Sequence, residues 1–251
     1  MPLEDAITPE WGAGAYVGAL MSTRAGGVST APFDRLNLGR SAGDERGAVD
    51  ENRRRFAAAL GGARPAWMSQ VHGARVLRLS AAPDFGTLEA DAAISTEPGI
   101  ACTVMVADCL PVLFAAPDGR GVGAAHAGWR GLAGGVLQAT VAALCEAAAC
   151  PATALHAWLG PCIGPRQFEV GADVVAALGG GPHFVERRRP DGAMRWLADL
   201  PALARDRLQA AGVARISGDT GCTVEEASRF FSFRRDGVTG RMAAAVWLRR
   251  S

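Results

Sequence analysis

The sequence predicts an α+β fold in which helices cover mixed β-sheet. Strand-like segments outnumber helix-like segments, and the clearest pair of strands is joined by a tight turn, which makes it antiparallel. The regular alternation of strands and helices typical of a parallel sheet is not seen in the pattern. With 251 residues and 49% hydrophobic content, the chain is long enough for one large domain or two small ones. Because no segment reads as a domain linker, we expect one domain over 1–251.

The strands are predicted from short apolar segments rich in β-branched and aromatic residues and bounded by turn residues. They are Tyr16–Met21, Ala74–Leu79, Ala92–Ser95, Ala101–Ala107, Val112–Ala116, Val122–His126, Leu155–Leu159, Arg215–Ser217 and Ala243–Leu248. Helices are predicted from longer periodic segments, three of which end at a glycine suited to the left-handed C-cap. These helices are Ala48–Leu60, Leu132–Ala148, Ala172–Leu178 and Leu200–Ala211.

The remaining polar segments are interpreted as surface. Glycines and a proline over 179–182, and the arginine-rich stretch Arg187–Gly192, are interpreted as surface loops rather than domain linkers. The run Arg53–Arg55 is interpreted as a solvated face of its helix.

The pair Asp118–Gly119 between two apolar runs predicts a β-hairpin. If these two residues form the loop, His126 faces Pro111, and Cys109 lies two residues further along that strand. Equal parity then puts Cys109 and His126 on one face as diagonal neighbours, roughly 7 Å apart. A thiol and an imidazole placed in this way can bind a metal ion or form a nucleophile–base pair.

His72 supplies a third group, because it precedes a glycine and reads as a turn residue at a strand end. Two histidines and one cysteine suit a zinc site with three protein ligands and an open fourth position, as in catalytic zinc sites. The alternative is structural. Cys109 would then be a small buried apolar residue, and the histidines would be hydrogen-bonded core or turn residues.

Composition excludes several classes of protein. All 26 basic residues are arginine, so a Schiff-base lysine, a pyridoxal phosphate anchor and a Walker A lysine are excluded. Four histidines are too few for the copper sites of a multicopper oxidase. Six cysteines without C-x-x-C spacing and a net charge of +1 indicate neither a disulfide framework nor nucleic acid binding.

The location of the protein is predicted from what the sequence lacks. No stretch approaches a membrane-spanning length of apolar residues, and the acidic start does not resemble a signal peptide. We therefore expect a cytoplasmic protein with no membrane partner.

Ordered motifs along nearly the whole chain identify it as resembling the YfiH-like, or laccase-domain, family. They include Ser22–Ser29, Leu36–Gly39, Gln70–Gly73, Ala107–Pro111, His126–Gly131, Gly160–Pro165, Phe168–Gly171, Cys222–Thr223, Phe231–Gly237 and Thr239–Arg241. The resemblance implies a layered α-β-β-α sandwich. It also implies zinc ligands at His72, Cys109 and His126, which agrees with the hairpin argument.

The resemblance implies a zinc-dependent purine nucleoside phosphorylase that also deaminates adenosine, acting on adenosine, inosine, guanosine and methylthioadenosine. Its partners would be a purine nucleoside and phosphate, and the chain a monomer or homodimer. One alternative is a peptidoglycan editing factor that removes a wrong amino acid from UDP-muramoyl precursors through a Cys109–His126 dyad. Another is a copper-dependent polyphenol oxidase, since Cu²⁺ accepts the same ligands.

These activities suggest roles for five polar residues. Asp108, beside Cys109, is the candidate proton carrier. Strand alternation points it away from Cys109, so the alternative is a supporting or strand-end residue. Arg24, in a turn after the first strand, and Arg130, at a helix start, are candidates for phosphate. Asn37 and Gln70 are candidates for the base or ribose. Each of these four residues has a structural alternative, satisfying loop carbonyls or stabilising a turn.

Overall fold

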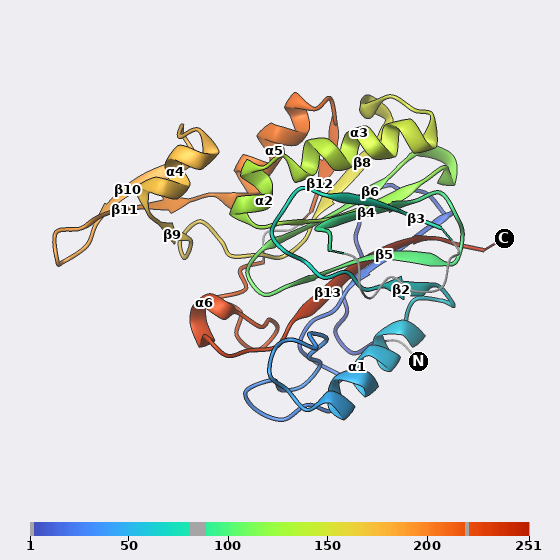
Figure 1. Ribbon diagram of the computed structural model, residues 1–251, viewed down its shortest axis with the longest axis horizontal. Helices are drawn as coiled ribbons and strands as arrows, with labels where there is room; N and C mark the ends of the chain where they lie inside the picture. The colour runs from blue at the N-terminus through green and yellow to red at the C-terminus, as the bar shows by residue number, and fades with distance from the viewer. Residues whose placement is uncertain (1–2, 81–88, 219–220, 251) are drawn as a thin grey trace.

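The computed structural model describes residues 3–80, 89–218 and 221–250, so parts of the domain predicted over 1–251 lie outside the described residues. Two stacked β-sheets form the centre of the molecule, with helices on both outer faces (Figure 1). Among the described residues, no helix combines the length and the apolar character needed to cross a membrane.

The first sheet is mixed and has the order β12-β8-β6-β7-β4-β3. Its strands are β12 (Arg215–Ser217), β8 (His156–Leu159), β6 (Leu110–Ala115), β7 (Val122–Ala127), β4 (Ala92–Ser95) and β3 (Val76–Leu79). The second sheet has the order β1-β13-β5-β2. Its strands are β1 (Val17–Met21), β13 (Met242–Leu248), β5 (Ile100–Val106) and β2 (Arg64–Ala66).

Three buried apolar clusters hold the four layers together. Helices α3 (Val136–Ala148) and α5 (Leu200–Ala210) share the first cluster with the first sheet. The second cluster lies between the sheets, where residues such as Leu113 meet residues such as Val104. The third joins the second sheet to α1 (Arg46–Ala58) through Phe56. This order of layers confirms the predicted α-β-β-α sandwich with mixed sheets.

A smaller three-stranded sheet extends from one end of the sandwich, next to α4 (Ala172–Leu178) (Figure 1). Its strands, in the order β10-β11-β9, are β10 (Phe184–Arg188), β11 (Met194–Ala198) and β9 (Glu169–Val170). The interpretation of Arg187–Gly192 as a loop is therefore wrong for its first two residues. The residues of β10 are largely exposed, so they lack the apolar alternation by which a strand is recognised.

The predicted helix over Leu132–Ala148 is in fact two helices, α2 (Trp129–Ala133) and α3. The chain breaks at Gly135, whose φ of +86° is left-handed and incompatible with a continuous helix. The four-residue helix α6 (Phe233–Asp236) and strand β2 were also not predicted. Both are too short to show a period.

The predicted hairpin is confirmed in its register. In β6 and β7, Leu110 pairs with Ala127 and Pro111 pairs with His126. Asp118 and Gly119 both have positive φ, +55° and +66°, as a turn of type I′ requires. This register fixes the position of the site described next, at the end of the hairpin opposite the turn.

Candidate metal centre

Three side chains from separate segments meet at the open end of the hairpin. His126 lies on β7, Cys109 directly precedes β6, and His72 lies in a turn before β3 with a φ of +62°. One ligand atom from each lies within 4.8 Å of the others. Cys109 Sγ is 3.9 Å from His72 Nε2, and the two imidazole rings meet edge to face at 4.8 Å. The predicted trio is thus brought together.

Asp91, at the start of the β4 region, supports two of the three groups. Its buried carboxylate lies 2.8 Å from His126 Nδ1 and accepts hydrogen bonds from the backbone N–H groups of His72 and Gly73, at 2.9 and 2.7 Å, and of Val71. With Nδ1 bound to Asp91, the Nε2 atom of His126 is left for the site. Asp91 was not predicted, since its partners lie at distant positions in the chain.

The charges of these groups stabilise one another. Burial by itself would raise the pKa of the Cys109 thiol, but the charge of His126 and hydrogen bonds from His126 and His72 lower this pKa to about 6. Burial would lower the pKa of His126, but the Cys109 thiolate and the Asp91 carboxylate raise it. The pair therefore favours a thiolate beside an imidazolium when no other cation is present.

Gly128 lets the backbone pass directly against the ligands. A Cβ atom at this position would lie 2.8 Å from Cys109 Sγ and 3.2 Å from His72 Cδ2. Its backbone is extended, with a φ of −68°, so the need for glycine is steric rather than conformational.

The residues fit a bound metal ion. Two imidazoles and a thiolate are the donors of three-ligand zinc sites, where the bonds measure about 2.0–2.1 Å to nitrogen and about 2.3 Å to sulfur. Small movements of side chains already within 4.8 Å of one another reach that geometry. The same donors also accept Cu²⁺. The other two histidines are engaged elsewhere, His156 with the Trp11 carbonyl and His183 with Asp206.

The metal-ligand group opens into a cavity of about 650 Å³. Apolar side chains, among them Trp67, Met105, Ile163, Phe168 and Phe233, form much of its wall. Five arginines also line it: Arg40, Arg53, Arg130, Arg234 and Arg241. A ligand with a flat apolar part and an anionic part matches such a wall.

Two of the four predicted substrate residues line this cavity. The amide of Gln70 is bound to the backbone of Met105, donating to its carbonyl at 2.8 Å and accepting from its N–H at 2.7 Å. Gln70 therefore fastens a cavity wall to β5. Arg130 is exposed and lies over the ring of Trp129 at 4.3 Å.

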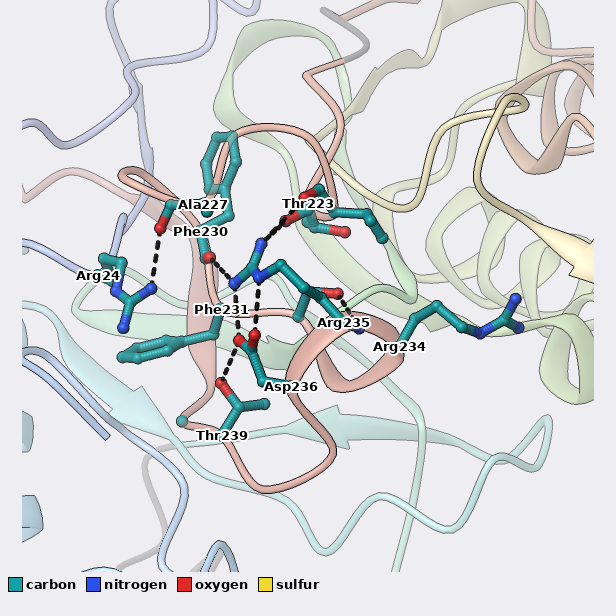
Figure 2. Close-up of polar contacts among 12 residues, drawn as sticks. Arg24, Thr223, Ala227, Phe230, Phe231, Arg234, Arg235, Asp236 and Thr239 are labelled. Atoms are coloured by element: carbon teal, nitrogen blue, oxygen red, sulfur yellow. Dashed lines mark hydrogen bonds and ion pairs between the residues drawn. The ribbon is translucent and has the colours of Figure 1, made fainter. Parts of the chain in front are cut away.

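The structure does not bring Arg24 or Asn37 to the lining of this cavity. Arg24 donates to the carbonyls of Asp34 and Ala227, and its guanidinium lies over Phe231, as Figure 2 shows for Ala227 and Phe231. Asn37 is buried, and its side-chain oxygen accepts from the N–H groups of Gly39 and Arg241. Both residues have the structural partners that the alternative reading described.

Asp108 lines the cavity but is held by the protein. Its carboxylate accepts from Thr223 Oγ1 and from the backbone N–H of Arg234, both at 2.6 Å. Its φ is +93°, so the chain is not a regular strand here and the alternation argument does not apply. These bonds attach α6 to the metal centre.

Arg235 anchors the α6 segment to the chain that precedes it (Figure 2). Its guanidinium donates to the carbonyls of Thr223 and Phe230 and to the carboxylate of Asp236. Arg234, the next residue, donates instead to the carbonyls of Gln167 and Glu169. Arg235 therefore stabilises the α6 segment internally, whereas Arg234 lies at the cavity.

The cavity residues Arg53 and Arg241 were not predicted. The interpretation of Arg53–Arg55 as a solvated face is wrong for Arg53, which is half-buried against Trp67 at 4.2 Å. Helical spacing contained a usable signal, because Arg53 lies one position from the buried Asn52 and three from the buried Phe56.

The fold and site define an α+β sandwich protein with a built His–Cys–His candidate metal centre. A family model described as "Multi-copper polyphenol oxidoreductase laccase" matches residues 18–249. The chain belongs to this family, which includes the YfiH proteins.

Close relatives cover almost the full chain. A protein of Pseudomonas aeruginosa named as a purine nucleoside phosphorylase is 49% identical over 247 residues, covering 96% of this chain and 98% of the relative. The purine nucleoside phosphorylase YfiH of Escherichia coli is 48% identical over 243 residues, with the same coverage.

Solved structures support the fold. A Neisseria meningitidis protein matches with a TM-score of 0.89 at 43% identity, covering 98% of this chain and 100% of that one. YlmD of Geobacillus stearothermophilus matches with a TM-score of 0.86 at 35% identity, covering 95% and 94%.

Proposed function

We propose that the protein is a zinc-dependent purine nucleoside phosphorylase that also deaminates adenosine. The observation that carries the proposal is the placement of His72, Cys109 and His126 in the wall of an arginine-lined cavity. Relatives that are 49% and 48% identical are named purine nucleoside phosphorylases. At about 650 Å³, the cavity has the size typical of small-molecule sites.

The proposed phosphorolysis joins phosphate to the ribose. A phosphate oxygen forms a bond to ribose C1′ while the bond from C1′ to the purine nitrogen breaks, and the purine leaves with a proton on a ring nitrogen. The cavity arginines would hold the phosphate, and the apolar side chains Phe168 and Phe233 would contact the base. The positive charge that develops on an oxocarbenium-like ribose would be stabilised mainly by groups already held in position around it.

For deamination, water adds at C6 of adenine and ammonia leaves. Zinc held by the three ligands would supply Lewis acidity and an acidic bound water. Asp108 is the proposed proton carrier, because its carboxylate lines the cavity and is held by Thr223 and by the Arg234 backbone. His126 would keep its orientation through Asp91.

The test uses pure protein with adenosine and phosphate. We expect adenine and ribose 1-phosphate, with inosine and ammonia from the second activity, and loss of both on chelation or in Cys109→Ala. His183→Ala is the matched control, because His183 lies in a surface pair with Asp206. Product formation unchanged by chelation and by Cys109→Ala would refute the zinc-dependent mechanism.

One geometric observation favours a second candidate. The ligand atoms of Cys109 and His126 lie within 4.8 Å, the arrangement of a cysteine–histidine dyad that would hydrolyse UDP-muramoyl precursors carrying a wrong amino acid. Cleavage of such precursors by metal-free protein, without nucleoside turnover, would favour this candidate. Metal analysis of protein purified without added metal shows whether the site holds zinc or copper. Copper would favour the polyphenol oxidase alternative.

A further inference from the structure

The arginines around the cavity differ in how their charge is compensated. Arg40 is exposed and paired with Asp50 at 2.8 Å, and Arg130 and Arg234 are exposed to solvent. Arg53 and Arg241 are half-buried, and neither has an ion-pair partner within the described ranges 3–80, 89–218 and 221–250. Charges removed from water without a partner are costly, and such groups in a cleft are candidates for a functional site.

Both guanidinium groups have N–H donors that find no acceptor among the described residues. A guanidinium has five N–H donors. Arg53 uses one on the Leu38 carbonyl and one on the sulfur of Met105, while Arg241 uses two on the carbonyls of Thr239 and Gly240. Five less two leaves three N–H groups on each residue without an acceptor in the described part of the chain. All the acceptors in use are neutral.

The two side chains converge on one short segment. Arg53 Nε donates to the Leu38 carbonyl at 2.9 Å, and the Leu38 N–H donates to the Arg241 carbonyl at 3.0 Å. A Cβ atom on Gly39 would lie 2.6 Å from Arg241 Cγ, so the stem of Arg241 runs directly over this glycine. Asn37 fixes the arrangement by accepting from the N–H groups of both Gly39 and Arg241.

The electrostatics of the two residues agree with this geometry. Burial and the neighbouring charge of Arg40 lower the pKa of Arg53 to about 10, although the charge of Asp50 acts in the opposite direction. Burial also lowers the pKa of Arg241, although the charges of Cys109 and Asp108 act in the opposite direction. A guanidinium group stays protonated at neutral pH in proteins. An anion bound by both residues would offset the repulsion between Arg53 and Arg40 and the cost of burying the two guanidinium groups.

We propose that Arg53 and Arg241 form a subsite for a phosphate group in the part of the cavity lined by Gly39. Two guanidinium forks with three unused donors each suit the several oxygens of a tetrahedral phosphate. Assigning this phosphate as the co-substrate of phosphorolysis rests on the proposed function. The shared chemistry allows two sources, free orthophosphate and the 5′-phosphate of a nucleotide.

The test measures binding first, so that it does not depend on turnover. Calorimetry on the full chain would compare orthophosphate, adenosine and AMP in wild type, Arg53→Met and Arg241→Met. The matched control is Arg54→Met, the next residue on α1, whose guanidinium is exposed and paired with Glu51. We expect orthophosphate affinity to fall about tenfold or more in the two subsite variants. Adenosine affinity and the control should stay within about twofold.

AMP separates the two sources. If the subsite takes the 5′-phosphate, wild type binds AMP more tightly than adenosine and loses that preference in Arg53→Met. If it takes orthophosphate, AMP shows no such preference, and the KM for phosphate rises in the variants while the KM for the nucleoside does not. Both outcomes support the subsite and assign its occupant.

Two further variants guard against simple misfolding. Arg53→Lys keeps the charge but loses the fork, and we expect intermediate phosphate affinity. Gly39→Ala adds the Cβ that displaces the Arg241 stem without removing any charge, and phosphate affinity should fall there too. Thermal melting and zinc content confirm that each variant is folded.

The subsite and the proposed function can fail separately. Phosphorolysis by wild type together with an unchanged KM for phosphate in folded Arg53→Met and Arg241→Met overturns the subsite alone. Phosphate binding that the two variants lose, without any phosphorolysis, overturns the proposed function alone. Wild type that binds neither orthophosphate at millimolar concentration nor AMP in preference to adenosine also overturns the subsite.

Discussion

Replacing Asp91 with asparagine tests the support of the metal centre. One carboxylate oxygen faces His126 Nδ1 and the His72 N–H, and the other faces the N–H groups of Gly73 and Val71. An asparagine keeps only one acceptor oxygen, so in either orientation its NH₂ group faces donors and two of them lose their acceptor.

The magnitude follows from that count. Leaving a buried donor unpaired costs ~1–3 kcal/mol, so two such donors lower the free energy of unfolding by ~2–6 kcal/mol. Mutating a residue that orients a metal-ligating histidine typically costs about 10–100-fold in metal affinity. We expect Asp91→Asn to show both effects.

The assay is competition for zinc with a chromophoric chelator, combined with urea unfolding of the metal-free protein. Asp44→Asn is the matched control, because the Asp44 carboxylate also accepts from protein donors, Ser29 and Asn37, but away from the metal ligands. It should lose stability and keep zinc affinity. A folded Asp91→Asn protein that binds zinc within about twofold of wild type would refute the reasoning.

Three further predictions concern the ligands. Iodoacetamide should alkylate Cys109 in metal-free protein with a midpoint near pH 6. The lowered pKa of Cys109 leaves the reactive thiolate present above that pH, and the thiolate is lost below it. A midpoint near that of an ordinary thiol would contradict the pair with His126. Gly128→Ala should lower zinc affinity about tenfold or more at unchanged helix content, because its Cβ displaces the Cys109 sulfur; unchanged affinity by chelator competition would show that the site adapts. Cys109→Ala should remove most bound zinc, whereas Cys145→Ala should not, as metal analysis of folded protein will show.

The part of the fold predicted from the sequence is the part set by local physics. The β6–β7 register follows from Asp118 and Gly119, because a two-residue turn with positive φ fixes every pair beyond it. The layers follow from apolar periodicity together with the family resemblance. The exposed hairpin of β10 and β11 was not recognised, since neither strand buries one face against the core.

The site divides in the same way. His72, Cys109 and His126 were found because their residue types are rare and two of them lie at the open end of one strand pair. Arg53 was missed because neighbouring arginines hide the one that turns inward. Asp91 was missed because its role depends on contacts with segments 18 to 35 residues away in the chain.

Two groups of cavity residues belong to different layers of the sandwich. The metal ligands are attached to the first sheet through β6, β7 and the turn before β3, whereas Arg53 lies on α1 and Arg241 directly precedes β13 of the second sheet. The relative position of the two groups is therefore set by the apolar cluster between the sheets, in which Leu113 and Val104 are fully buried. Close-packed cores of this kind resist sliding. The same packing that stabilises the fold thus holds the arginines and the metal ligands in a fixed arrangement, which the proposed reaction between a bound anion and a bound nucleoside would require.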